Sequence, residues 1–153
     1  MEITGKKSIS CAIKIILEIG LIILIIMFIF LPFILSIYIK AFRRDILDYY
    51  FHCLALLYIS AIPMLMLVWQ FIKLFDSLRL NTPFIMENVK HLKKASLYSG
   101  IIAIEYIAGI FVFRSIFALL IIGIFLVAFV GLYILSELFK QAVTYKEEND
   151  LTI

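Results

Sequence analysis

Cysteine, histidine and glycine are scarce in this chain of 153 residues, which contains two, two and six of them. Two cysteines, Cys11 and Cys53, are too few for a disulfide framework or a zinc site. The sequence has no phosphate-binding glycine loop and no HExxH, GxSxG or CxxC motif. It therefore predicts neither an enzyme nor a protein that binds a metal or a cofactor.

Charged residues are also scarce, because Asp, Glu, Lys and Arg make up 16% of the chain while hydrophobic residues make up 65%. The mean hydropathy is +1.12. Soluble domains are about half apolar, so this composition predicts an integral membrane protein. The first apolar run is longer than the core of a signal peptide and is followed by no small-residue cleavage site, so we expect it to remain as a span.

Four apolar segments are long enough to cross a hydrocarbon core of roughly 30 Å, which takes about 20 helical residues. They cover residues 15–39, 51–75, 95–113 and 116–139. A single helix covering the last two segments would be about 65 Å long, so the chain must reverse near Arg114. The predicted fold is one all-α integral membrane domain, with four transmembrane helices arranged as two hairpins.

The longest polar stretch, residues 76–99, separates the second and third spans. Asn81 or Thr82 can cap a helix, and Pro83 suits the first helical position. Apolar residues then recur at helical spacing, which predicts a short amphipathic cytoplasmic helix over residues 83–97 that lies at the membrane surface and runs straight into the third span. Residues 140–153 form a polar, acidic tail.

Four spans place both termini, the amphipathic helix and the tail on one side of the membrane. Ten of the 14 lysine and arginine residues lie on that side, which the positive-inside rule assigns to the cytoplasm. His52 and His91 then lie on opposite sides and cannot share a metal ion. Cys11 and Cys53 also lie at opposite faces, so we expect no disulfide between them.

Glu105 is the acidic residue predicted nearest to the bilayer midplane, about 15 Å into the third span. A carboxyl group at this depth is costly and is expected to face other helices. Tyr58 and Ser60, at similar depth in the second span, are its predicted partners. Two interpretations are open: a proton- or ligand-responsive switch or intersubunit polar seam, and a purely structural hydrogen bond.

Other residues are predicted to shape the helix contacts. Pro32, inside the first span, should kink it. Glu18 and Glu137 are predicted to form interfacial ion pairs with Lys14 and Lys140. Four glycines permit close contacts within or between subunits: Gly100, Gly109, Gly123 and Gly131.

The basic cluster KHLKK, residues 90–94, favours anionic lipid headgroups by about 1 kcal/mol for each basic residue. Docking of a protein is the alternative. Direct binding of nucleic acid is not expected, because the chain has neither a DNA-binding fold nor an aromatic stacking platform.

Two stretches, TPFIMENVKHLKK and FKQAVTYKEENDLTI, resemble segments of the Domain of Unknown Function 2975 family. The matching positions are Pro83, Phe84, Asn88, Glu148, Asp150, Leu151, Thr152 and Ile153. With the span pattern, the resemblance covers nearly the whole chain and implies a small four-span membrane protein of mostly Gram-positive bacteria, with no assigned catalytic residues. Its members are often encoded beside a small Cro/CI-type helix-turn-helix protein, which implies a regulatory pairing.

The sequence and this resemblance together predict a membrane-embedded regulatory protein of a bacterial plasma membrane, acting alone or in an oligomer. Its cytoplasmic helix and acidic tail would sequester or signal to a small helix-turn-helix regulator. The predicted partner-binding residues are Pro83, Phe84, Asn88, Lys90, His91, Lys93, Lys94, Glu147, Glu148, Asp150, Leu151 and Ile153.

Two alternatives come from other functional classes. One is an accessory or immunity-type subunit that acts with another membrane protein. The other is a small oligomeric channel or transporter, with Glu105 lining the path.

Overall fold

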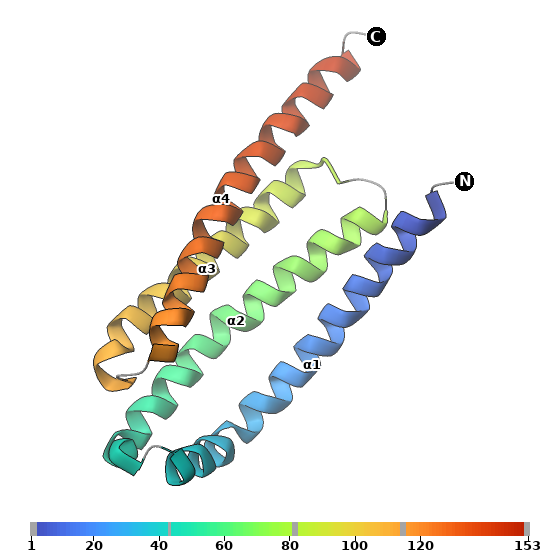
Figure 1. Cartoon of the computed structure of the whole chain (residues 1–153). Helices are drawn as coiled ribbons and strands as arrows, with labels where there is room; N and C mark the ends of the chain where they lie inside the picture. Colours follow the sequence, from blue (N-terminus) through green and yellow to red (C-terminus); the bar gives the residue numbers. More distant parts are fainter. Residues whose placement is uncertain (1–2, 43, 81–82, 114–115, 152–153) are drawn as a thin grey trace.

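The computed structural model of the chain describes residues 3–42, 44–80, 83–113 and 116–151 (Figure 1). These residues are almost entirely helical, which confirms the predicted all-α class. The elements are α1 (Ile3–Phe42), the 3-10 helix η1 (Arg44–Tyr49), α2 (Tyr50–Arg79), α3 (Met86–Phe113) and α4 (Ile116–Leu151). The turn predicted at Arg114 lies outside the described residues.

The helices lie antiparallel in a row that follows the order of the chain. α1 packs on α2, α2 on α3 and α3 on α4, and nearly all contacts among the described helices join such neighbours. The start of α1 and the end of α4 lie at the same end of the molecule (Figure 1). The arrangement is therefore an open row with α1 and α4 at its edges, rather than a closed bundle.

Three segments among the described residues are long and apolar enough to cross a membrane: Ser10–Phe42, Leu47–Leu78 and Ile116–Asn149. Large aliphatic side chains cover their outer surfaces; Ile29 is 68% exposed and Val127 is 75% exposed. Such continuous apolar surface is suited to lipid rather than water. α3 is not among these three segments, which were sought only within the residues whose side chains the structure describes, up to residue 110 in α3.

The predicted amphipathic helix and the predicted tail are parts of longer helices. α3 runs unbroken from Met86 to Phe113, so the amphipathic segment continues directly into the apolar stretch as predicted, but it begins at Met86 rather than at Pro83. α4 likewise continues through the tail to Leu151. Neither segment contains a proline after its first turn, so nothing in the sequence ends these helices at the polar boundary.

α3 packs closely on α4 through small residues. The Ser96 hydroxyl donates a hydrogen bond to the backbone carbonyl of Phe129 on α4, at 2.8 Å. A Cβ atom placed on Gly100 would lie 3.0 Å from the ring of the same phenylalanine. Small residues four positions apart thus let the two backbones approach, as is common in membrane helix pairs.

The α2 side of α3 is equally close at Gly109, where a Cβ atom would overlap the side chain of Leu56. Gly123 and Gly131, in contrast, are exposed on α4, and no described neighbour lies within 4 Å of a Cβ placed there. Of the four glycines expected at close contacts, Gly100 and Gly109 therefore make them within this chain.

Pro32 lies inside α1, where it lacks the N–H group that would bond to the carbonyl of Phe28 one turn earlier. The Tyr58 hydroxyl of α2 donates a hydrogen bond to that carbonyl at 3.3 Å. The Tyr50 hydroxyl donates to the carbonyl of Pro32 itself at 3.0 Å. α2 therefore satisfies the backbone that the proline leaves open, as an apolar surrounding requires.

Replacing Tyr58 with phenylalanine is expected to lower the free energy of unfolding by about 0.5–1 kcal/mol, a typical value for one interhelical hydrogen bond in a membrane protein. Thermal unfolding of the full-length protein in detergent measures this cost. In a Pro32→Ala background the cost should shrink, because alanine at position 32 restores the missing N–H group. An equal cost in both backgrounds would contradict this role of Tyr58.

Candidate functional site

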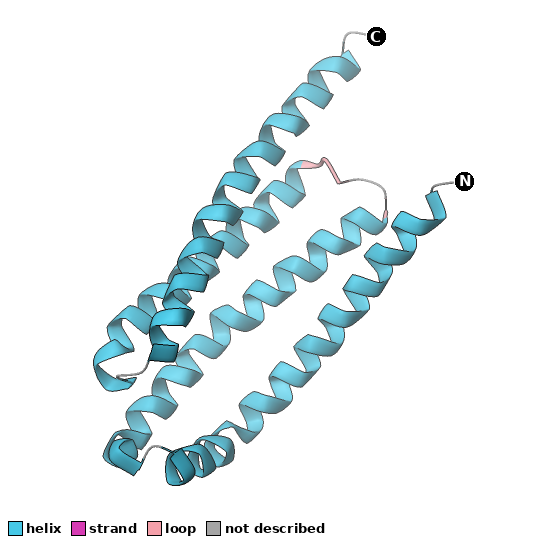
Figure 2. Cartoon of the chain, viewed as in Figure 1, coloured by secondary structure: helices cyan, strands magenta, loops and turns pink. Residues whose placement is uncertain are grey.

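The polar residues singled out by the sequence gather at one end of the molecule. The start of α1, the end of α2, the start of α3 and the end of α4 all lie there (Figure 1). We call this the terminal end. Figure 2 shows that the described loop residues before α3 also lie at it.

Asn88 joins α2 to α3 from a buried position, because its side chain is only 1% exposed. Its Oδ1 atom accepts a hydrogen bond from the Ser77 hydroxyl at 2.8 Å, and its Nδ2 atom donates to the Pro83 carbonyl at 2.7 Å. Asn88, predicted as a partner-binding residue, is therefore buried between the two helices. Its two hydrogen bonds hold the amide between α2 and α3, where it is not accessible to a partner.

His91 makes a second link between the same two helices. Its Nδ1 atom lies 2.7 Å from Oε1 of Gln70 on α2, and its Nε2 atom lies 3.7 Å from Oε1 of Glu87. Burial lowers the pKa of His91 below its ordinary value, and the charges of Lys94 and Lys73 act in the same direction, while Glu87 opposes them. His91 is thus a half-buried imidazole near the positive charges of two lysines.

The lysines around this link point outward. Lys90, Lys93 and Lys94 are all exposed on the first turns of α3. Lys73 of α2 is exposed as well, with its ammonium group 5.1 Å from the centre of the Trp69 ring. The sequence prediction missed Lys73, although its spacing of four residues from Trp69 is a signal for such a cation–π pair.

The end of α4 contributes an exposed helical extension. Phe139 contacts Phe84 with ring centres 5.6 Å apart, and Val143 is 2% exposed. Beyond Val143 the described side chains of α4 are exposed, including those of Glu147 and Glu148. Of the remaining predicted tail residues, Ile153 and the side chains of Asp150 and Leu151 lie outside the described part.

An ion-pair cluster ties α1 to α2 at the terminal end. The Lys14 ammonium lies 3.4 Å from the Glu18 carboxylate, which confirms the predicted pair, and 2.6 Å from Oδ1 of Asp76. The Asp76 contact was not predicted, because it depends on how two separate helices align. The predicted partner of Glu137, Lys140, forms no ion pair with it in the described structure.

Glu105 does not contact the partners predicted for it. Tyr58 is bonded to the carbonyl of Phe28, and the Ser60 hydroxyl donates to the carbonyl of Leu57 at 3.0 Å and lies beside Tyr106. The Oε2 atom of Glu105 is buried and has no hydrogen-bond partner among the described residues. Within this chain, Tyr58 and Ser60 therefore bond to backbone carbonyls rather than to Glu105.

Comparison with known proteins places the chain in a family. It matches the family described as "Protein of unknown function (DUF2975)" over residues 13–153. The chain belongs to the DUF2975 family. This confirms the resemblance carried by the two motif segments, and the match includes nearly all of the four long helices.

Among curated proteins, this DUF2975 chain is similar to the "Uncharacterized membrane protein YoaS" of Bacillus subtilis (strain 168). The two are 32% identical over 108 residues, which cover 63% of this chain and 68% of the relative. No solved structure matches the chain. The relative and the apolar helices together support an association with membranes.

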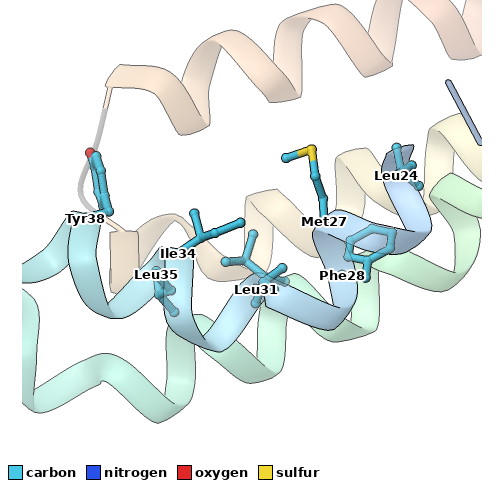
Figure 3. Close-up of a pocket in the computed structure, with 8 residues that line it drawn as sticks. Leu24, Met27, Phe28, Leu31, Ile34, Leu35 and Tyr38 are labelled. Carbon is cyan, nitrogen blue, oxygen red and sulfur yellow. The ribbon is translucent and has the colours of Figure 1, made fainter. Parts of the chain in front are cut away.

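A cavity of about 270 Å³ lies along α1 of this DUF2975 chain, lined by residues from Leu24 to Tyr38 and by Leu57 of α2 (Figure 3). Tyr38 supplies the polar atom of this otherwise apolar lining. Among the described residues, no group of three His, Cys, Asp or Glu side chains could hold a metal ion.

Proposed function

We propose that this DUF2975 chain is a four-span protein of a bacterial plasma membrane, with both termini in the cytoplasm. Three segments have the length and apolarity of spans. Residues 95–113 of α3 add a fourth apolar stretch of about 28 Å, close to the thickness of the hydrocarbon core. The excess of lysine and arginine at the terminal end supports its cytoplasmic position.

We propose further that the terminal end binds a small helix-turn-helix regulator and sequesters it or signals to it. The observation that carries this proposal is the projecting end of α4, which continues as an exposed polar helix beyond the buried Val143. Glu147 and Glu148 on this extension suit a basic surface, which DNA-binding proteins carry. Exposed Tyr145 adds an aromatic contact of the kind that dominates binding energies.

Glu105 is proposed as the residue that alters how the terminal end is presented. It lies on the same unbroken helix as the exposed lysines and Asn88. An acid without a hydrogen-bond partner in an apolar setting gains stability when it binds a proton or finds a partner. Either event would shift the balance of contacts along α3 and so change the surface at its start.

The test is a pull-down of the tagged full-length protein from its native host in mild detergent, followed by identification of the bound proteins. We expect a small helix-turn-helix protein with the intact chain and its loss when residues 146–153 are deleted. The deletion begins beyond the last buried residue of α4, Val143, so the helix row should be preserved. The variant Glu147→Gln/Glu148→Gln should weaken binding, whereas Lys140→Gln serves as the charge control.

Two results would overturn the proposal. Recovery of the regulator with the deletion variant would exclude the tail as its binding element. Recovery of membrane subunits without a regulator would favour the accessory or immunity-type function instead.

A further inference from the structure

Two lysines on different helices lie near His91 at the terminal end. Lys73 belongs to α2 and Lys94 to α3, and the charge of each acts on the imidazole. His91 and Gln70 link the two helices at 2.7 Å, and each lysine follows its linked residue by three positions, about one helical turn. The link therefore brings two exposed lysines from different helices to the same part of the terminal end.

The positive charge of Lys73 and Lys94 beside His91 is not balanced by carboxylates within the described protein. In the part of the chain that the structure describes, neither Lys73 nor Lys94 makes an ion pair. Glu87 is the carboxylate that faces the group, at 3.7 Å from His91, and it is 72% exposed. Two lysines against one carboxylate leave a net positive charge, which favours an anionic ligand.

Lys73, His91 and Lys94 lie where the polar surface of the terminal end meets an apolar surface. Below Lys73 on α2, an exposed apolar stripe begins with Trp69 and continues through Met66 and Ile62, which are 46%, 45% and 64% exposed. These positions are three and four residues apart and so share one helix face. Tryptophan at such a boundary is typical of the membrane interface.

We propose that Lys73, His91 and Lys94 form a binding site for the phosphate group of an anionic phospholipid, whose acyl chain lies along the Trp69–Met66–Ile62 stripe. Basic groups between membrane helices recognise anionic headgroups in this way. Free inorganic phosphate shares the headgroup chemistry but gains nothing from the apolar stripe. This inference does not depend on the proposed regulator, since it needs only that the terminal end meets the membrane surface.

The first experiment measures lipid binding to the purified full-length protein in detergent by native mass spectrometry. Phosphatidylglycerol is compared with phosphatidylcholine of the same chain length. The variant Lys73→Gln/Lys94→Gln should weaken phosphatidylglycerol binding about 25-fold, which is about fivefold for each lysine. The control Lys140→Gln/Lys146→Gln removes the same total charge from exposed positions on α4 at the same end and should change binding by less than about twofold.

Three outcomes would overturn the site. Equal weakening in the two double variants would show diffuse attraction, and equal binding of phosphatidylcholine would show that the phosphate charge is not recognised. Displacement of phosphatidylglycerol by millimolar inorganic phosphate would identify free phosphate as the ligand instead of a lipid.

A second readout follows His91 itself, by NMR titration of the full-length protein. Bound phosphate places negative charge beside the imidazole, so phosphatidylglycerol should raise the pKa of His91, whereas phosphatidylcholine should not. Gln70, Glu87, Lys73 and Lys94 are the groups known to face this ring. The lipid-dependent rise should vanish in Lys73→Gln/Lys94→Gln and persist in Lys140→Gln/Lys146→Gln; a rise that persists in both variants would contradict the proposal.

Discussion

An aspartate in place of Asn88 is expected to lower the free energy of unfolding by about 3 kcal/mol or more, the cost of leaving a charge buried without a matching partner. The side chain is 1% exposed, and its Nδ2 atom donates to the Pro83 carbonyl at 2.7 Å. Aspartate turns this donor into a charged oxygen that faces another oxygen. Thermal unfolding of the full-length protein in detergent at neutral pH measures the loss.

Lowering the pH distinguishes a buried charge from a steric misfit as the cause of the lost stability in Asn88→Asp. A protonated aspartic acid regains a donor for the Pro83 carbonyl, so part of the lost stability should return as the pH falls. Asn88→Ala should cost about 1–3 kcal/mol at any pH, because it removes the Nδ2 donor to the Pro83 carbonyl and one acceptor of the Ser77 hydroxyl, which also donates to the Leu74 carbonyl. The exposed neighbour variant Glu87→Gln should stay within about 0.5 kcal/mol. An Asn88→Asp protein as stable as the wild type would rule out the buried bridge.

Valine in place of Gly109 is expected to destabilise the protein by about 1–3 kcal/mol, the usual cost of overpacking. Even a Cβ atom at this position would overlap the Leu56 side chain of α2. The same measurement on Gly123→Val is the matched control, since the space around Gly123 is open and the gain in side chain is identical. That control should change the stability by less than about 0.5 kcal/mol.

A compensating substitution tests whether Leu56 is the cause. Leu56→Ala removes the overlapping atoms, so Gly109→Val should cost less in that background than in the wild type. Additive costs in the double variant would mean that the clash lies elsewhere and that α2 and α3 do not meet closely at this point.

Apolar periodicity was sufficient to predict the helices, because a run of isoleucine and leucine long enough to cross a bilayer has few alternatives. It could not predict where polar side chains find their partners. Asn88 occupies a position that counts as polar on a helical wheel, yet it is buried because Ser77 and Pro83 meet it there. Such contacts depend on how one helix is rotated against the next.

Glu105 illustrates the same limit. Equal depth in the membrane suggested Tyr58 as its partner, but depth along a helix does not determine the direction in which a side chain points. The signal for the true partner of Tyr58 was present elsewhere, since Pro32 leaves the Phe28 carbonyl in need of a donor. The proline thus marked a carbonyl in need of a donor, but the rotation of α2 decides that Tyr58 supplies it.

The continuity of α4 has a mechanical consequence. Its 36 residues form one rod of about 54 Å. A rod held at one end converts rotation into displacement, so tilting α4 by about 10° about its start would move its far end sideways by about 9 Å. Membrane helices accommodate changes in bilayer thickness by tilting. A change in thickness would therefore move the exposed end of α4, which bears Glu147 and Glu148, sideways.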